Sequence, residues 1–144
     1  MENQETKKEN ISPDKYREIL KGLNMESIYL LTSKSSVDKK SIASGLRISF
    51  RDEASFEKKE DKIVEITHKY RLEATNKKLK KKVLNIECTF CLIYSFGEEF
   101  SADFFEVFKD INLPLNTWPF FREFVFNITS RMNVPPLTLP LLKR

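Results

Sequence analysis

The sequence predicts an α+β fold in which an antiparallel sheet of three or four long strands is layered against helices. Hydrophobic and polar residues alternate along three long runs between residues 45 and 96. Such alternation is typical of antiparallel strands that have one covered face and one wetter face. Helical spacing of apolar residues occurs outside these runs, in residues 12–23 and again beyond residue 101. A group of strands followed by helices favours an α+β arrangement.

The strands are defined by apolar residues at every second position. These runs cover Leu46–Phe56, Val64–Ala74 and Leu84–Phe96. The connecting segments 57–62 and 76–82 are short and charged, as hairpins require. A further strand is expected at Met25–Thr32, followed by a polar loop to about Ser44. A small sheet of long strands has open edges, so we expect the chain to self-associate.

Two helices are expected on either side of the strands. The first covers Ser12–Leu23, because Ser12 and Pro13 form a start signal and Gly22 an exit signal. The second covers Ala102–Asn112, and it leaves Phe105 outside the apolar face formed by Phe104, Val107, Phe108 and Ile111.

A third helix is expected over residues 117–132. Thr117 is suited to cap it, Pro119 lies in the first turn where no backbone donor is lost, and Asn133 is suited to the exit. The apolar surface of this helix is wider than the single face that a core would bury, because Trp118, Phe120 and Phe126 lie beside that face. A Leu-rich tail follows. So much apolar surface at the end of a small domain predicts contact with a partner chain or a polypeptide client.

The composition is that of one globular domain. The chain has 144 residues, 40% of them hydrophobic and 32% charged, so it can form a core without disulfides. We expect residues 1–11 to be a disordered tail and residues 12–144 to be a single domain. Twelve Phe residues against four Tyr and one Trp favour packing and hydrophobic recognition over hydrogen-bonded catalysis.

The predicted location is the cytoplasm. The chain has no run of the roughly 18 apolar residues needed to span a bilayer. Its polar start differs from a secretory signal, and two cysteines suit a reducing compartment. We therefore expect no insertion into a membrane.

The residues that could carry chemistry have simpler structural interpretations. Cys88 and Cys91 have C-x-x-C spacing, but residues three apart on a strand point to opposite faces, so we expect one buried thiol and one on the outer face. His68 lies on the apolar strand face, where we expect a core histidine bonded to a neighbour. The sequence predicts no catalytic residue, metal site or cofactor, and therefore no enzyme.

The lysine run at Lys77, Lys78, Lys80, Lys81 and Lys82 accounts for much of the formal net charge of +4. We interpret it first as a solvated turn that discourages aggregation. An anion or partner patch is the alternative. Nucleic-acid binding is the weaker hypothesis, because no aromatic residues are interleaved with the lysines.

The end of the chain resembles the SecB family of protein-export chaperones. The resemblance lies in Trp118-Pro119-Phe120-Phe121-Arg122-Glu123, in Thr129-Ser130-Arg131, and in the Pro-Pro-Leu-Thr-Leu tail. Upstream, residues 25–117 are similar in layout only. The basic charge departs from the acidic sheet face on which the family docks its export motor, and the sequence has no counterpart of the family's C-terminal helix.

The resemblance implies a four-stranded antiparallel sheet with helices packed on one face. It implies a homo-oligomer, a dimer or tetramer, that holds unfolded or newly made polypeptides on a hydrophobic surface without ATP. The client-contacting residues would be Phe105, Trp118, Phe120, Leu137 and Leu139. An export motor is a further implied partner. The alternative is a dedicated subunit for one partner, such as an antitoxin.

Overall fold

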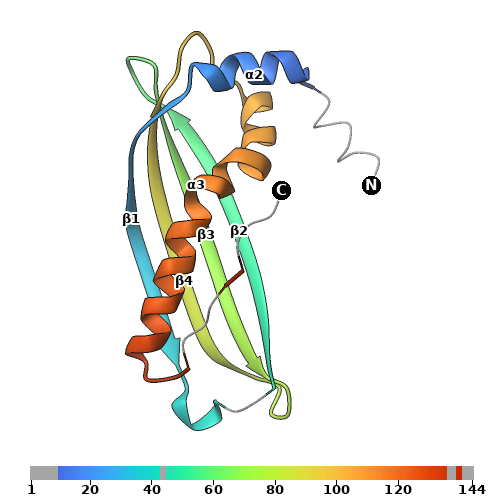
Figure 1. Ribbon diagram of the computed structural model, residues 1–144, viewed down its shortest axis with the longest axis vertical. Helices are drawn as coiled ribbons and strands as arrows, with labels where there is room; N and C mark the ends of the chain where they lie inside the picture. Colours follow the sequence, from blue (N-terminus) through green and yellow to red (C-terminus); the bar gives the residue numbers. More distant parts are fainter. Residues whose placement is uncertain (1–9, 43–44, 136–138, 141–144) are drawn as a thin grey trace.

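The computed structural model describes residues 10–42, 45–135 and 139–140. The elements follow in the order α2 (Pro13–Lys21), β1 (Asn24–Val37), the 3-10 helix η1 (Lys39–Ser41), β2 (Leu46–Lys58), β3 (Ile63–Asn76), β4 (Lys81–Ser95) and α3 (Ala102–Arg131). Figure 1 shows a long sheet with α3 running along it and α2 across one end. Most of the expected N-terminal tail lies outside the described residues.

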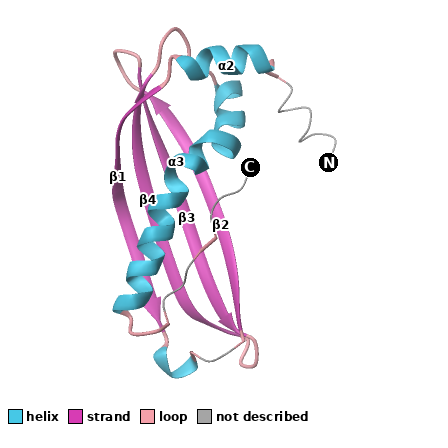
Figure 2. Cartoon of the chain, in the orientation of Figure 1, coloured by secondary structure: helices cyan, strands magenta, loops and turns pink. Residues whose placement is uncertain are grey.

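The four strands form one antiparallel sheet in the order β1-β4-β3-β2. β3 and β4 lie in the centre, so each pairs on both sides, whereas β1 and β2 are edge strands. Both helices lie on the same side of the sheet (Figure 2). The predicted α+β fold with a four-stranded sheet and helices on one face is therefore confirmed.

The first helix forms where the sequence predicts it. Ser12 accepts a hydrogen bond from the Lys15 backbone nitrogen at 3.1 Å, which satisfies a free donor of the first turn. The helix ends at Gly22. Tyr16 stacks on Phe104 with ring centroids 4.9 Å apart, which attaches α2 to the start of α3.

The two C-terminal helices that the sequence predicts are one helix of 30 residues. Pro114 and Pro119 lie inside it, so Pro119 is not in a first turn and Thr117 is not a cap. Neither proline has an N–H for the carbonyl four residues earlier, and Figure 1 shows α3 bending along its upper part. Thr117 is buried and bonds to side chains of β3, so packing holds the helix together where local signals predict a break.

The first strand is also longer than predicted, because it continues to Val37 through the segment expected to be a loop. Lys34, Ser35 and Ser36 pair in register with Glu87, Ile86 and Asn85 of β4. An edge strand tolerates this polar sequence, because its outer edge faces solvent.

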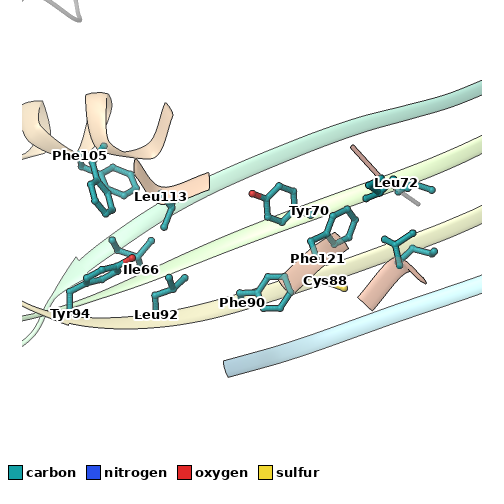
Figure 3. Close-up of a cluster of buried hydrophobic side chains, with 14 of the residues drawn as sticks. Ile66, Tyr70, Leu72, Cys88, Phe90, Leu92, Tyr94, Phe105, Leu113 and Phe121 are labelled. Carbon is teal, nitrogen blue, oxygen red and sulfur yellow. The ribbon is translucent and has the colours of Figure 1, made fainter. Parts of the chain in front are cut away.

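The core lies between α3 and the two central strands. The inner residues of β3 and β4 are at most 5% exposed, from Val64 and Tyr94 at one end to Asn76 and Leu84 at the other. Phe121 from α3 stacks on Tyr70 with centroids 4.8 Å apart. Figure 3 shows these rings with Phe90 and Leu92 beneath the helix.

Candidate polypeptide-binding surface

One helix is too narrow to cover this sheet. Adjacent strands lie about 4.8 Å apart, so the axes of the two edge strands are about 14 Å apart. A helix with its side chains is about 10 Å wide. Because α3 lies over β3 and β4, the inner faces of β1 and β2 are left partly open, and each carries apolar side chains.

The first open region, the β1 strip, consists of Met25, Leu30 and Phe120. Met25 and Leu30 pair in register with inner residues of β4, so they belong to the helix side of the sheet, yet they are 45% and 42% exposed. Phe120 projects from α3 on the same side. Its ring centroid lies 6.3 Å from that of buried Phe90, the register partner of Leu30. The β1 strip is therefore an apolar shelf beside α3.

The second open region, the β2 strip, consists of Ile48, Phe50 and Trp118. Ile48 and Phe50 are 40% and 41% exposed on the inner face of β2. Trp118 is half-buried, and its ring meets Phe50 edge-on at 5.6 Å. Trp118 and Phe120 thus extend the apolar surface to opposite sides of the helix.

Residues 139–140 lie against the β2 side of α3. Leu139 is 4% exposed, and its carbonyl accepts a hydrogen bond from Arg122 Nε at 2.6 Å. The Pro140 carbonyl accepts one from Trp118 Nε1 at 2.8 Å. These contacts place a leucine side chain against this side of α3 and pair two side-chain donors with main-chain carbonyls.

The solvent side of α3 carries a further apolar site. Leu115 and Phe126 are 45% and 47% exposed. Phe126 borders an open hollow of about 320 Å³ that Pro119, Arg122 and Glu123 complete. Apolar surface therefore surrounds much of α3. A helix that is hydrophobic on most sides is normally covered by other protein.

A buried polar network fixes the middle of α3 to the sheet. His68 is fully buried, and its Nε2 lies 2.8 Å from Asp52 Oδ2 while its Nδ1 lies 2.9 Å from Thr117 Oγ1. The Tyr70 hydroxyl lies 2.8 Å from the same threonine oxygen. The hydrogen bond from His68 lowers the pKa of Asp52. The prediction of a core histidine bonded to a neighbour is confirmed, and the network sets the position of Trp118 and Phe120.

The cysteines point to opposite faces, as predicted, and the thiol on the outer face is buried as well. Cys91 is 1% exposed, because its register partners Tyr29 and Thr67 cover it from both sides. Burial raises the pKa of Cys88 to about 12, so this thiol is not a reactive nucleophile at neutral pH. Among the described residues, no group of three His, Cys, Asp or Glu side chains is placed to hold a metal.

The residues predicted to contact a client occupy different environments. Phe120 is exposed and Trp118 is half-buried, whereas Phe105 and Leu139 are each 4% exposed. Phe105 packs on Phe56 with centroids 4.7 Å apart. Leu137 lies outside the described residues. Sequence reasoning did not single out Leu30, Met25 or Phe50, because nothing in strand alternation tells an edge strand from a central one.

Comparison with solved structures identifies a similar fold in a protein of known type. A solved structure titled as the SecB-like chaperone Rv1957 of Mycobacterium tuberculosis, in complex with a ChAD peptide from the Rv1956 HigA1 antitoxin, superposes with a TM-score of 0.73. The match covers 87% of this chain and 94% of that chain at 19% identity. The fold is SecB-like. The resemblance seen in the C-terminal motif thus extends to the whole architecture.

Other comparisons add no argument about function. A protein of unknown function from Streptococcus agalactiae superposes on this chain with a TM-score of 0.42 at 11% identity, and the match covers 83% of this chain and 97% of that chain. No family model matches the chain, and no curated protein does. Neither of the described α-helices combines the length and hydropathy that a membrane span requires.

Proposed function

We propose that this protein is an ATP-independent holdase chaperone that binds unfolded or newly made polypeptides on the apolar surface around α3. The observation that carries the proposal is the exposure of large hydrophobic side chains on both sides of one helix, in the β1 strip and the β2 strip. The SecB-like fold and the peptide-bound state of the mycobacterial chaperone support it. Burial of client side chains would provide about 25 cal/mol per Å².

Several sites on one surface suit a client without a fixed sequence. Each apolar contact is weak alone, but contacts along one chain reinforce each other through effective concentration. Self-association into a dimer or tetramer would multiply the sites further, and light scattering measures that state. We place the first client contacts at Phe120 and Trp118. Phe105 and Leu139 would contribute beneath the surface, as the layer on which the exposed rings rest.

The test is suppression of aggregation of a chemically denatured substrate at stoichiometric amounts. The native protein should slow light scattering, and Phe120→Ser combined with Leu30→Ser should lose most of that effect. Leu79→Ser is the matched control, because Leu79 is 60% exposed but lies in the hairpin between β3 and β4, outside the β1 strip. A native protein without effect, or equal loss in all variants, would refute the proposal.

A dedicated partner is the second candidate, because the mycobacterial neighbour is bound to a peptide from an antitoxin. Binding measurements on a panel of unrelated unfolded polypeptides separate the two functions. A holdase should bind most of them within about tenfold in Kd. A dedicated subunit should bind one at least about a hundredfold more tightly than the rest, and the β1-strip variant should weaken that one complex.

Delivery to an export motor has less support. The sheet face away from the helices mixes both signs of charge, as in the ion pairs of Glu73 with Arg51 at 3.0 Å and with Lys82 at 2.8 Å. An acidic face for motor docking, which the SecB resemblance would imply, is not what these residues form. The proposal therefore concerns the holding of polypeptide chains.

A further inference from the structure

The fold brings together basic residues that are far apart in the sequence. At one end of the sheet lie the β3–β4 hairpin, η1, the start of β2 and the end of α3 (Figure 1). Main-chain and side-chain contacts join them. Asn76 Nδ2 donates to the Ser41 carbonyl at 2.8 Å, and Lys39 Nζ donates to the Asn133 carbonyl at 2.6 Å. We call this region the basic end.

The charge of the basic end is strongly one-sided. Residues 34–40, 45–49, 73–83 and 128–135 contain ten basic residues and two acidic ones. The formal net charge of the whole chain is only +4, so the rest of the chain is net acidic. The two carboxylates, Asp38 and Glu73, are already paired with Lys81 at 2.7 Å and with Lys82 at 2.8 Å. Among the described residues, Lys40, Lys77 and Lys80 have no carboxylate partner.

The hairpin at this end is held in a fixed shape. The buried Asn76 side chain accepts hydrogen bonds from the backbone nitrogens of Lys78 and Leu79 at 2.9 and 3.1 Å, and Lys80 adopts a left-handed φ of 52°. Arg47, Lys77 and Lys80 border one open hollow of about 340 Å³. Three cations beside one hollow suit a phosphate group.

The exposure of Leu79 favours one class of polyanion over another as the ligand of the basic end. It is 60% exposed, the most exposed large hydrophobic residue described, and lysines flank it at positions 77, 78, 80, 81 and 82. A nucleic acid would be bound by the charges alone, and the hairpin has no aromatic ring on which a base could stack. An anionic bilayer attracts the lysines and also accepts an apolar tip at its surface.

We propose that the basic end docks on anionic phospholipid membranes, with lipid phosphates beside Arg47, Lys77 and Lys80 and with Leu79 entering the interface. Docking is peripheral and reversible, because one leucine and a group of lysines do not anchor a protein permanently. The β1 strip, and Phe50 and Trp118 of the β2 strip, lie outside the basic end, so a client held there remains accessible while the basic end faces the membrane.

The experiment is co-sedimentation of the full chain with vesicles of phosphatidylcholine alone or with about a third phosphatidylglycerol. The protein should bind only the anionic vesicles and should dissociate as salt is raised, because the Debye length shrinks to about 3 Å at 1 M. Lys77→Ala combined with Lys80→Ala should lower the partition coefficient about 25-fold, since each lysine contributes about a factor of five.

The control is Lys58→Ala combined with Lys62→Ala. This pair lies at the β2–β3 hairpin, removes the same charge, and also changes one left-handed lysine, with Lys62 at φ 57°. It should retain most of the binding. Leu79→Trp should show a blue shift in fluorescence with anionic vesicles but not with soluble glycerol phosphate, which distinguishes a lipid surface from a free phosphate.

Three results would overturn the proposal: equal binding of neutral and anionic vesicles, equal loss in both lysine pairs, or binding of an RNA homopolymer without binding of vesicles. Aggregation suppression is measured without lipid, so a failure of membrane docking leaves the holdase proposal standing. The reverse also holds, because Phe120→Ser should not change vesicle binding.

Discussion

The inner face of the sheet differs between its centre and its edges. In β3 and β4 the apolar inner side chains are almost completely buried, as Leu72 and Leu92 at 0% exposure illustrate. In β1 and β2 the corresponding side chains, such as Leu30 and Phe50, are 42% and 41% exposed. All four strands belong to one sheet, so the difference comes from the width of the single covering helix. The centre provides stability, and the edges provide surface for other chains.

The largest expected effect of a substitution is in the centre. Phe121 is fully buried against Tyr70 and Trp118, with ring centroids at 4.8 and 6.0 Å. Phe121→Ala should lower the free energy of unfolding by about 3–5 kcal/mol through lost burial and a cavity. Urea denaturation measures the change. Phe126→Ala is the control, because it removes the same type of side chain from the solvent side of α3. If it lowered the free energy of unfolding as much as Phe121→Ala, the difference between covered and exposed positions would be contradicted.

The next effect concerns the network between α3 and β3. Thr117→Val keeps the shape of the side chain but removes the hydroxyl that bridges His68 and Tyr70. Removing this hydroxyl from a buried hydrogen-bond network should cost about 1–3 kcal/mol. Ser130→Ala is the control, because its exposed hydroxyl bonds to the Phe126 carbonyl within the same helix. Thermal unfolding followed by circular dichroism compares the two, and equal stability of both variants would exclude a role for the network.

A smaller effect depends on pH and lies where the β2 strip meets the centre. The pKa of Asp52 is lowered from its ordinary value of 3.8, mainly by the hydrogen bond from His68. A carboxyl group whose pKa is lowered by folding stabilises the folded state above its ordinary pKa, and this contribution is lost as the pH falls through the lowered value. Asp52→Asn should therefore be less stable than the native chain at pH 7, by less than about 1 kcal/mol, because the Asp52 side chain is 52% exposed and solvent screens the interaction.

The two stability curves should converge as the pH falls below 3.8 and through the lowered pKa of Asp52, because the carboxyl group is then protonated in both the folded and the unfolded state of the native chain. Urea titrations at several pH values measure this. Glu53→Gln is the control, because Glu53 lies next in the sequence on the opposite face of the sheet. A difference between the native chain and Asp52→Asn that stays as large at the acid end of the titration as at pH 7 would refute the carboxylate's role.

The sequence predicts this division only in part. Alternation in β3 and β4 identifies which residues face the helix, because a period of two is a property of the strand itself. The same alternation in β2 does not reveal that Ile48 and Phe50 stay exposed, since exposure depends on how far α3 extends across the sheet. Phe105 is a similar case. The spacing leaves it outside the helix face, yet it is buried, while Ile111 on the predicted face is 44% exposed.

Local rules also fail where tertiary contacts dominate. Two prolines and a capping threonine predict a break in the C-terminal helix, but Thr117 bonds instead across to the sheet and the helix continues. The basic end, too, can be predicted from the sequence only in part. The lysine run is visible in the sequence, but its union with Lys39, Lys40 and Arg47 depends on the pairing of β2 with β3 and on the contact between Asn76 and Ser41.

The smallest effect on stability is expected at the edge, where it separates folding from function most sharply. Leu30 and Leu72 are the same residue type on the same face of the sheet, and they differ mainly in whether α3 covers them. Leu72→Ala should cost about 2–5 kcal/mol, whereas Leu30→Ala should cost less than about 1 kcal/mol, because much of its side chain is already in water. For client holding we expect the opposite order, with a larger loss in Leu30→Ala than in Leu72→Ala. The measurement is suppression of aggregation at a temperature at which both variants remain folded. If Leu30→Ala destabilised the fold as strongly as Leu72→Ala, β1 would belong to the core and the exposed strip would not exist as a binding surface.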